Sequence, residues 1–239
     1  MTLPGKTSNA IKRSWLHRLQ SWVQKPIEQK IWGLGGRMTA LSYLLWVRSH
    51  RYDFDGIIHP HELLAEPNSS VAHSTHYLVS DVYSLKLLLD EALSERDSFE
   101  VFLDIGCGKG MPSLYAQSHY AFKESIGMDF SEKLIEIAQS NLRKSGRSDV
   151  RFIQADASSF KIAPQSSVVY LHNPFGPELL KTFLENNLEH FKMHSSVIAY
   201  AFDVHRNVLN ELGFEVLYRS QRFAHSLWQV SDTRFEDSP

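Results

Sequence analysis

Four polar side chains occur where short apolar runs end, and predicted parallel strands would bring them together. They are Asp104, Asp129, Asp156 and Asn173. The first run, 99–103, is too short for a buried helix and is bounded by glycines, so we expect a buried strand. Ligands bind beyond the carboxyl ends of strands in open α/β sheets. Each residue alone could be an ordinary surface or turn residue, but four in register favour a functional crevice.

Three glycines follow Asp104 at alternate positions, Gly106, Gly108 and Gly110. Glycine lets the backbone turn sharply, and a ligand can approach where a Cβ would collide. A helix start follows at 114–119, and strand, glycine loop and helix together are typical of a nucleoside-like cofactor site. A dinucleotide site requires its third glycine three residues after the second. Met111 occupies that position, which argues against pyrophosphate binding.

Strands and helices are expected to alternate through the rest of the chain. Ser80 and Asp81 are good N-caps for an amphipathic helix before the first strand. Further helices are expected from Ser131, Pro177 and Val204, and further strands at 125–128, 150–153, 167–171, 196–201, 214–218 and 223–230. This order predicts a mostly parallel sheet with helices on both faces. No helix fits between the last two strands, which are predicted to form an antiparallel hairpin.

The sequence D-I-G-C-G-K-G, residues 104–110, resembles the first motif of the class I S-adenosylmethionine (SAM) dependent methyltransferases. The resemblance covers residues 80–232. It implies a Rossmann-like α/β fold whose seven-stranded, mostly parallel sheet ends in an antiparallel hairpin. The cofactor implied is SAM.

The resemblance also implies a role for each residue of the crevice. Asp104 would hold the amino end of SAM, directly or through water, and Asp129 would accept both ribose hydroxyls. Phe130 would cover the adenine face, and Asp156 would accept from the adenine amino group. The remaining expected cofactor contacts are Gly106, Cys107, Gly108, Gly110, Ala157 and Asn173. Cys107 is expected to be a small loop filler, and Lys109 is expected to point to solvent.

Asn173-Pro174-Phe175 resembles the (Asn/Asp)-Pro-Pro-(Tyr/Phe) signature of methyltransferases that act on nitrogen, with Phe175 in place of the second proline. The Asn173 and backbone carbonyls would accept N–H bonds from the acceptor, and Phe175 would stack on it. Catalysis would then be mainly positioning, because SAM is already activated. His172 is a candidate base, and Tyr77 is a candidate for lining the cofactor mouth. Asn-Pro-Phe also occurs in little-characterised bacterial methyltransferases, and its region loosely resembles some protein-lysine enzymes.

These features predict a SAM-dependent methyltransferase that acts on nitrogen of a protein side chain, a nucleic-acid base or a small molecule. One alternative is a non-catalytic SAM-binding module that engages a partner through a basic arm. Another is aminopropyl transfer from decarboxylated SAM, but Asn173 replaces the acid expected there on the fourth strand. Asn-Pro could also be only a turn that ends the strand.

The N-terminal segment differs in composition from the rest. Residues 1–52 contain nine lysines and arginines but only one acid, Glu28, and four of the five tryptophans. Apolar residues at helical spacing predict helices at 11–23 and about 39–47. We favour a helical cap, residues 1–60, on a methyltransferase domain, residues 61–239. The alternatives are contact with an anionic membrane surface or with nucleic acid.

The sequence disfavours a disulfide-bonded, a membrane-spanning and a metal-binding protein. One cysteine, Cys107, rules out an intramolecular disulfide and favours a reducing, cytoplasmic location. The apolar run 38–47 is too short to span a bilayer. His59, His61, His73 and His76 form two close pairs, but no cysteine lies near them, so no metal is expected.

Overall fold

The computed structural model describes residues 36–56, 80–95, 98–220 and 223–231. The chain divides into two compact units, Met1–Trp46 and Val47–Pro239. The first unit contributes to a helix over residues 36–50, which confirms the helix expected at about 39–47. The helix expected at 11–23 lies outside the described residues. The sequence-based boundary at residue 60 also falls outside them and stays a prediction.

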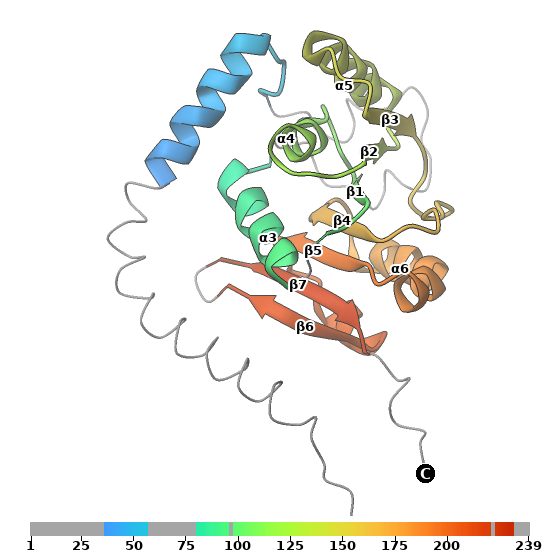
Figure 1. Cartoon of the computed structure of the whole chain (residues 1–239). Coiled ribbons are helices and arrows are strands. Elements are labelled where there is room, and N and C mark those ends of the chain that lie inside the picture. The colour runs from blue at the N-terminus through green and yellow to red at the C-terminus, as the bar shows by residue number, and fades with distance from the viewer. Residues whose placement is uncertain (1–35, 57–79, 96–97, 221–222, 232–239) are drawn as a thin grey trace, which may run out of the picture. The chain divides into compact units, whose positions relative to one another are not determined.

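A seven-stranded sheet forms the centre of the second unit, with the order β3-β2-β1-β4-β5-β7-β6 (Figure 1). The first five strands run parallel, whereas β7 pairs antiparallel with both β5 and β6. The strands are β1 (Val101–Ile105), β2 (Glu124–Asp129), β3 (Val150–Gln154), β4 (Ser167–His172), β5 (Val197–Ala201), β6 (Phe214–Arg219) and β7 (His225–Val230). The predicted fold class and terminal hairpin are confirmed.

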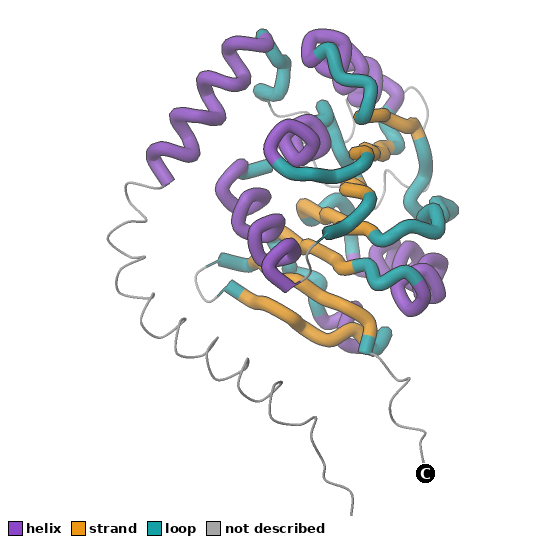
Figure 2. Tube along the Cα trace, in the orientation of Figure 1, coloured by secondary structure: helices purple, strands orange, loops and turns teal. Residues whose placement is uncertain are grey.

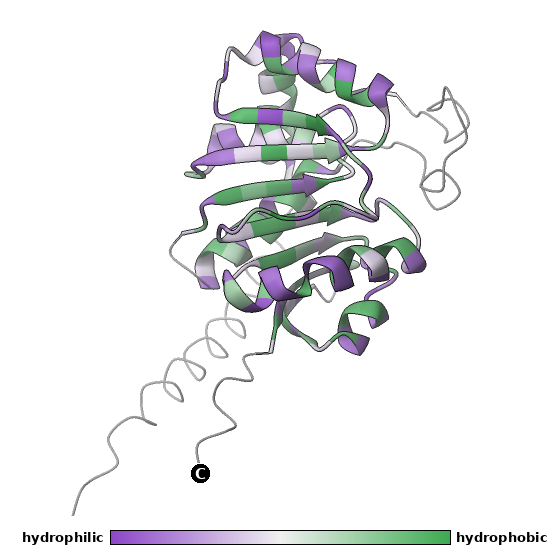
Figure 3. Ribbon diagram, turned by 90° about the vertical axis from the view of Figure 1, so that its right-hand side faces the viewer, coloured by the Kyte–Doolittle hydropathy of each residue, from purple (hydrophilic) through white to green (hydrophobic). Residues whose placement is uncertain are grey.

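Helices cover both faces of this sheet (Figure 2). On one face, α4 (Met111–His119) contacts β1 and β2, between α3 (Val82–Glu95) and α5 (Glu132–Ser145). On the other face lie α6 (Pro177–Met193) and α7 (Asn207–Glu211), which share a hydrophobic cluster with β1, β4 and β5. The central strands are largely hydrophobic because both of their faces are covered (Figure 3).

Local sequence signals explain where the helix after β2 begins and ends. The Ser131 side chain accepts a hydrogen bond from the Leu134 N–H at 3.4 Å, as an N-cap does. Gly146 ends the helix in the left-handed conformation, φ 67°, which is favourable for glycine. These two signals place α5 beside the glycine loop.

Candidate cofactor and acceptor site

The glycine loop between β1 and α4 has the conformation that its sequence predicts. Gly106, Gly108 and Gly110 have φ values of 76°, 54° and 84°, which side-chain-bearing residues rarely adopt. The Gly106 and Cys107 N–H groups donate to the Met128 carbonyl at 2.8 and 2.9 Å, and so tie the loop to β2. A Cβ on Gly106 would lie 2.5 Å from the Pro174 Cβ. The loop therefore lies against the Asn173-Pro174 turn at the end of β4.

Asp129, at the end of β2, is buried and accepts two backbone hydrogen bonds. Its Oδ2 accepts from the Gly108 N–H and its Oδ1 accepts from the Ser131 N–H, both at 2.9 Å. Burial raises the pKa of Asp129 to about 6, against the lowering effect of those donors. A carboxylate has about four lone-pair sites. The carboxylate therefore keeps acceptor capacity for a further donor, as a ribose hydroxyl would supply.

Asp104, near the end of β1, is 1% exposed. The Ser113 hydroxyl on α4 donates to its Oδ2 at 3.2 Å. Burial raises the pKa of Asp104 to about 8, the Ser113 hydrogen bond opposes the rise, and the Asp129 charge adds to it. A buried carboxyl in this state favours a cationic ligand, since a positive charge would stabilise its ionised form.

Asn173 follows β4 directly and has a φ of 46°, in the left-handed region that asparagine tolerates better than most residues. The Tyr200 hydroxyl on β5 donates to its Oδ1 at 3.5 Å. Pro174 contacts the glycine loop, as described above. The structure thus brings together Asp104, Asp129, the glycines and Asn173.

Phe175 differs from the expected stacking residue. It is 5% exposed and belongs to the hydrophobic cluster beneath α6. Its ring centroid lies 6.3 Å from that of Phe183 on α6. A ring packed into the core cannot also lie on a substrate, so the structure gives Phe175 a packing role.

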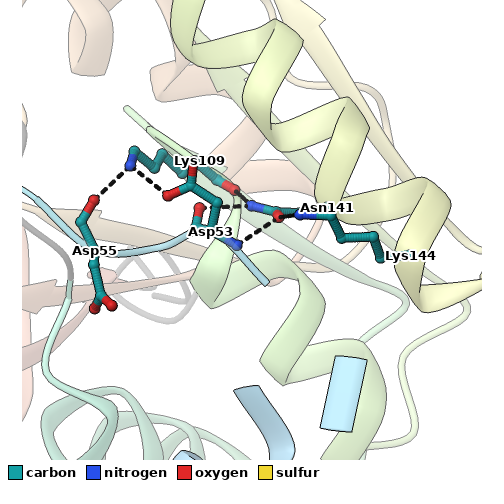
Figure 4. Close-up of polar contacts among 5 residues, drawn as sticks. All are labelled: Asp53, Asp55, Lys109, Asn141 and Lys144. Carbon is teal, nitrogen blue, oxygen red and sulfur yellow. Dashed lines mark hydrogen bonds and ion pairs between the residues drawn. The ribbon is translucent and has the colours of Figure 1, made fainter. Parts of the chain in front are cut away.

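Lys109 was predicted to point to solvent, and this prediction is wrong. Its side chain is 7% exposed, and its Nζ donates to Asp53 Oδ1 at 2.8 Å (Figure 4). The sequence held no local sign of this contact, since the partner lies 56 residues away.

The other expected cofactor residues lie around the same edge of the sheet. Asp156 Oδ1 accepts from the Ser158 N–H at 2.8 Å, and Ala157 is buried. Phe130 is half-buried. Cys107 is buried, and this burial raises the pKa of its thiol well above the usual value. A protonated, buried thiol matches a loop filler and is a poor nucleophile.

Phe202 and His225 lie near His172, and the sequence did not indicate either of them. Phe202, which follows β5, has a φ of 54° and is 45% exposed. Its ring lies edge-on to His172 and to His225 on β7, with centroids 5.1 and 5.7 Å apart. His172 and His225 both pair in register with Ala201. Phe202 could have been found by its position, since it follows the fifth strand as Asn173 follows the fourth.

His225 is buried and His172 is half-buried, and both rings are neutral at pH 7. Burial, helped by the neighbouring His225, lowers the pKa of His172 to about 4. Burial also lowers the pKa of His225. The Nε2 atom of each is buried and hydrogen-bonds to none of the described residues. The ends of β4, β5 and β7 therefore form an aromatic and imidazole rim beside Asn173.

The remaining predicted positions cannot be placed. Tyr77 and the four histidines His59, His61, His73 and His76 lie outside the described residues. Within the described ranges, no three His, Cys, Asp or Glu side chains are grouped closely enough to hold a metal ion. Across those same ranges, none of the helices combines the length and the apolar character that crossing a membrane requires.

Comparison with known proteins gives a family match. Residues 102–194 match the model of the methyltransferase domain family. The uncharacterized Bacillus subtilis protein YbxB is 26% identical over 113 residues, which cover 46% of this chain and 56% of YbxB. The match thus spans about half the length of that relative.

Two solved structures illustrate the likeness in fold. Ribosomal protein L11 methylase from Lactobacillus delbrueckii subsp. bulgaricus aligns with a TM-score of 0.46 at 13% identity, over 62% of this chain and 78% of the other. Magnesium protoporphyrin IX methyltransferase from Synechocystis PCC 6803, solved with bound SAM, aligns with a TM-score of 0.44 at 14% identity, over 61% and 76%.

Residues 102–194 are thus similar to the methyltransferase domain family, and the sheet order and the glycine loop agree with the class I SAM-dependent resemblance. The sequence resemblance implies SAM as the cofactor, and the matched family is a methyltransferase domain. The residues present fit that cofactor. The Asp129 oxygens retain acceptor capacity for hydroxyls. A cationic group beside the buried Asp104 would stabilise its ionised carboxylate. When bound, SAM supplies a methyl group on a positively charged sulfur.

Proposed function

We propose that this protein transfers the SAM methyl group to a nitrogen atom, with Asn173 holding the acceptor. The contact between Pro174 and the glycine loop carries the proposal, since a Cβ on Gly106 would lie 2.5 Å from the Pro174 Cβ. The Asn173 turn and the cofactor loop are thus parts of one surface. An amide oxygen beside the cofactor can accept an N–H bond and so aim the nitrogen lone pair at the methyl carbon.

The chemical step needs little from the protein beyond position. The nitrogen lone pair forms the new N–C bond, while the electrons of the S–CH3 bond stay on sulfur. The acceptor nitrogen then loses a proton. His172 is neutral at pH 7 because burial lowers its pKa to about 4, so it can accept a hydrogen bond from this proton but is a weak base.

The rim beside Asn173 supports a planar or apolar acceptor group. Phe202 exposes 45% of its surface at the end of β5, next to His172. Because Phe175 is buried in the core, Phe202 is the better candidate for stacking on the acceptor. The expected stacking role thus passes from Phe175, which follows β4, to Phe202, which follows the neighbouring strand β5.

A labelling experiment tests the proposal. The protein is incubated with methyl-labelled SAM and dialysed cell extract, and the labelled product is identified by mass spectrometry. Label that survives mild alkali is expected, since N-methyl groups are stable to it. Alkali-labile label would indicate transfer to a carboxylate oxygen and contradict the proposal. SAM binding without any transfer would indicate a non-catalytic module instead.

Replacing Asn173 by alanine sharpens this test. Turnover should fall roughly 100-fold, as when one positioned hydrogen-bonding group is removed from an active site. The SAM dissociation constant should change far less than turnover, because the proposed main role of Asn173 is to hold the acceptor. Asn210→Ala, at an exposed position of α7, is the matched control. Unchanged turnover in Asn173→Ala would show that the motif is only a turn.

A further inference from the structure

A short segment, residues 52–55, lies against the glycine loop. We name residues 52–55 the strap. Tyr52 and Phe54 are buried at 8% and 1% exposure, and their ring centroids lie 4.9 Å apart. Asp53, between them, has a side chain that is 55% exposed. The two rings anchor the strap, and the intervening carboxylate is left free to face the loop.

The Lys109 ammonium joins the strap to the loop. Its Nζ donates to Asp53 Oδ1 at 2.8 Å and also to the Asp55 backbone carbonyl (Figure 4). Lys109 stands between Gly108 and Gly110, and its side chain is 7% exposed. A buried ammonium is costly unless it is paired and hydrogen-bonded. The loop is therefore held in the position where Lys109 meets both partners.

A buried asparagine on α5 completes the connection. The Asp53 N–H donates to Asn141 Oδ1, and Asn141 Nδ2 donates to the Asp53 carbonyl, both at 2.9 Å. The same Nδ2 also donates to the Lys109 carbonyl at 3.1 Å. Figure 4 shows Asn141 joined by dashed lines to both Asp53 and Lys109. One side chain thus fixes the strap, the loop and α5 relative to one another.

The glycine loop is also attached to β2, where the expected cofactor residue Asp129 lies. The Gly108 N–H donates to Asp129 Oδ2 at 2.9 Å, one residue before Lys109. Glycines have no side chains with which to hold the loop, and their backbones are freer than those of other residues. The attachments to Met128 and Asp129 on β2, together with the attachment to the strap, therefore hold the loop amides in place.

We propose that the strap is a positioning element of the SAM site, with Asp53 and Asn141 as positioning residues that act through Lys109. Fixing the loop in advance lowers the cost of binding, because less freedom is lost when SAM arrives. The proposal concerns cofactor binding and does not depend on the acceptor.

Asp53→Asn tests it with little disturbance, because the replaced side chain is largely at the surface. We expect the dissociation constant for SAM, measured by calorimetry, to rise about tenfold, as when a supporting outer partner of a binding site is removed. Hydrogen exchange of a peptide spanning 105–111 should also become faster in the cofactor-free protein. Phe191→Leu is the control, since Phe191 is a buried core residue of α6, on the other face of the sheet.

The control separates loop positioning from general loss of stability. Phe191→Leu should lower the melting temperature yet leave SAM affinity and the 105–111 exchange unchanged. Equal effects in the two variants, or no effect in Asp53→Asn, would overturn the proposal. Failure of the wild-type protein to bind SAM would instead contradict the cofactor assignment itself.

A double-mutant cycle provides the second measurement. In Lys109→Met the ammonium is removed, so adding Asp53→Asn should cause little further loss of SAM affinity. Additive losses would show that the two residues act independently, which contradicts the proposal.

Discussion

The two halves of the crevice differ in how their polar groups are satisfied. At the ends of β1 and β2, the Asp129 carboxylate accepts two backbone hydrogen bonds and Asp104 accepts one from Ser113. At the ends of β4, β5 and β7, His172 and His225 each have a buried Nε2 without a partner among the described residues. The carboxylates of the first half are held by hydrogen bonds within the protein, whereas the second half presents aromatic surface and two Nε2 atoms without a described partner.

This difference fits the two tasks of a transferase site, which are to bind the cofactor and to bind the acceptor. A fixed cofactor needs a fixed set of partners, and the loop around Gly106, Gly108 and Asp129 supplies one. Acceptors vary within a fold, so the acceptor half must be argued from its own residues. Three measurements can break or sharpen this comparison, and each changes one half or the contact between them.

The largest effect is expected from Gly106→Ala, which disturbs the contact between the halves. A Cβ there would lie 2.5 Å from the Pro174 Cβ, in a backbone with φ 76°. The left-handed conformation alone costs an alanine about 1–2 kcal/mol, and the clash adds to that cost. SAM affinity should fall about 30-fold or more by calorimetry, and turnover should fall as well.

Gly213→Ala is the control for backbone strain. Gly213 has a φ of 79°, but a Cβ there would have nothing within 4 Å. It should therefore lose some stability and keep SAM affinity. If both variants bind SAM normally, the loop and the Asn173 turn do not share a surface.

A smaller effect is expected from pH, and it should be confined to the cofactor half. The pKa of Asp104 is about 8 in the cofactor-free protein, and a bound cation would lower it. SAM binding should then release a proton below pH 8, so affinity should rise with pH up to about 8, by at most about tenfold per pH unit. Calorimetry in two buffers with different ionisation heats measures the release.

Asp104→Asn separates this effect from the titration of SAM itself. The variant should lose the proton release and bind SAM with an affinity that varies less with pH. The same raised pKa means that folded Asp104 holds a proton which the unfolded chain loses near 3.8. Its contribution to stability is therefore present at low pH and lost as pH rises towards 8. Proton release that persists in Asp104→Asn would assign it to another group.

The smallest effect is expected in the acceptor half alone. Phe202→Ala removes an exposed ring, so the rate at limiting cell extract should fall about 3- to 10-fold, the range of a single aromatic contact. SAM affinity should stay the same. Val216→Ala, an equally exposed residue (49%) on the outer strand β6, should change neither quantity. Loss of SAM affinity in Phe202→Ala would contradict the separation of the crevice into a cofactor half and an acceptor half.

The fold and the cofactor half were predictable because their signals are local. The apolar runs, the glycines and the caps around Ser131 and Gly146 act on their own neighbours in the chain, and they placed the strands and the residues at their ends. Phe175 and Lys109 show where this reasoning stops. Their side-chain directions depend on Phe183 and on Asp53, which no local pattern connects to them. His225 joins the rim only because β7 inserts beside β5.

The strap also has a consequence for the order in which parts of the chain fold. Asp53 is made before its partners, since Lys109 follows 56 residues later and Asn141 follows 88 residues later. Contacts across such sequence distances close slowly, so we expect the strap to dock after the glycine loop and α5 have formed. A shortened chain that begins at residue 61, the boundary suggested by composition, would keep every strand but lack Asp53. Such a fragment would carry the ammonium of Lys109 without its carboxylate partner.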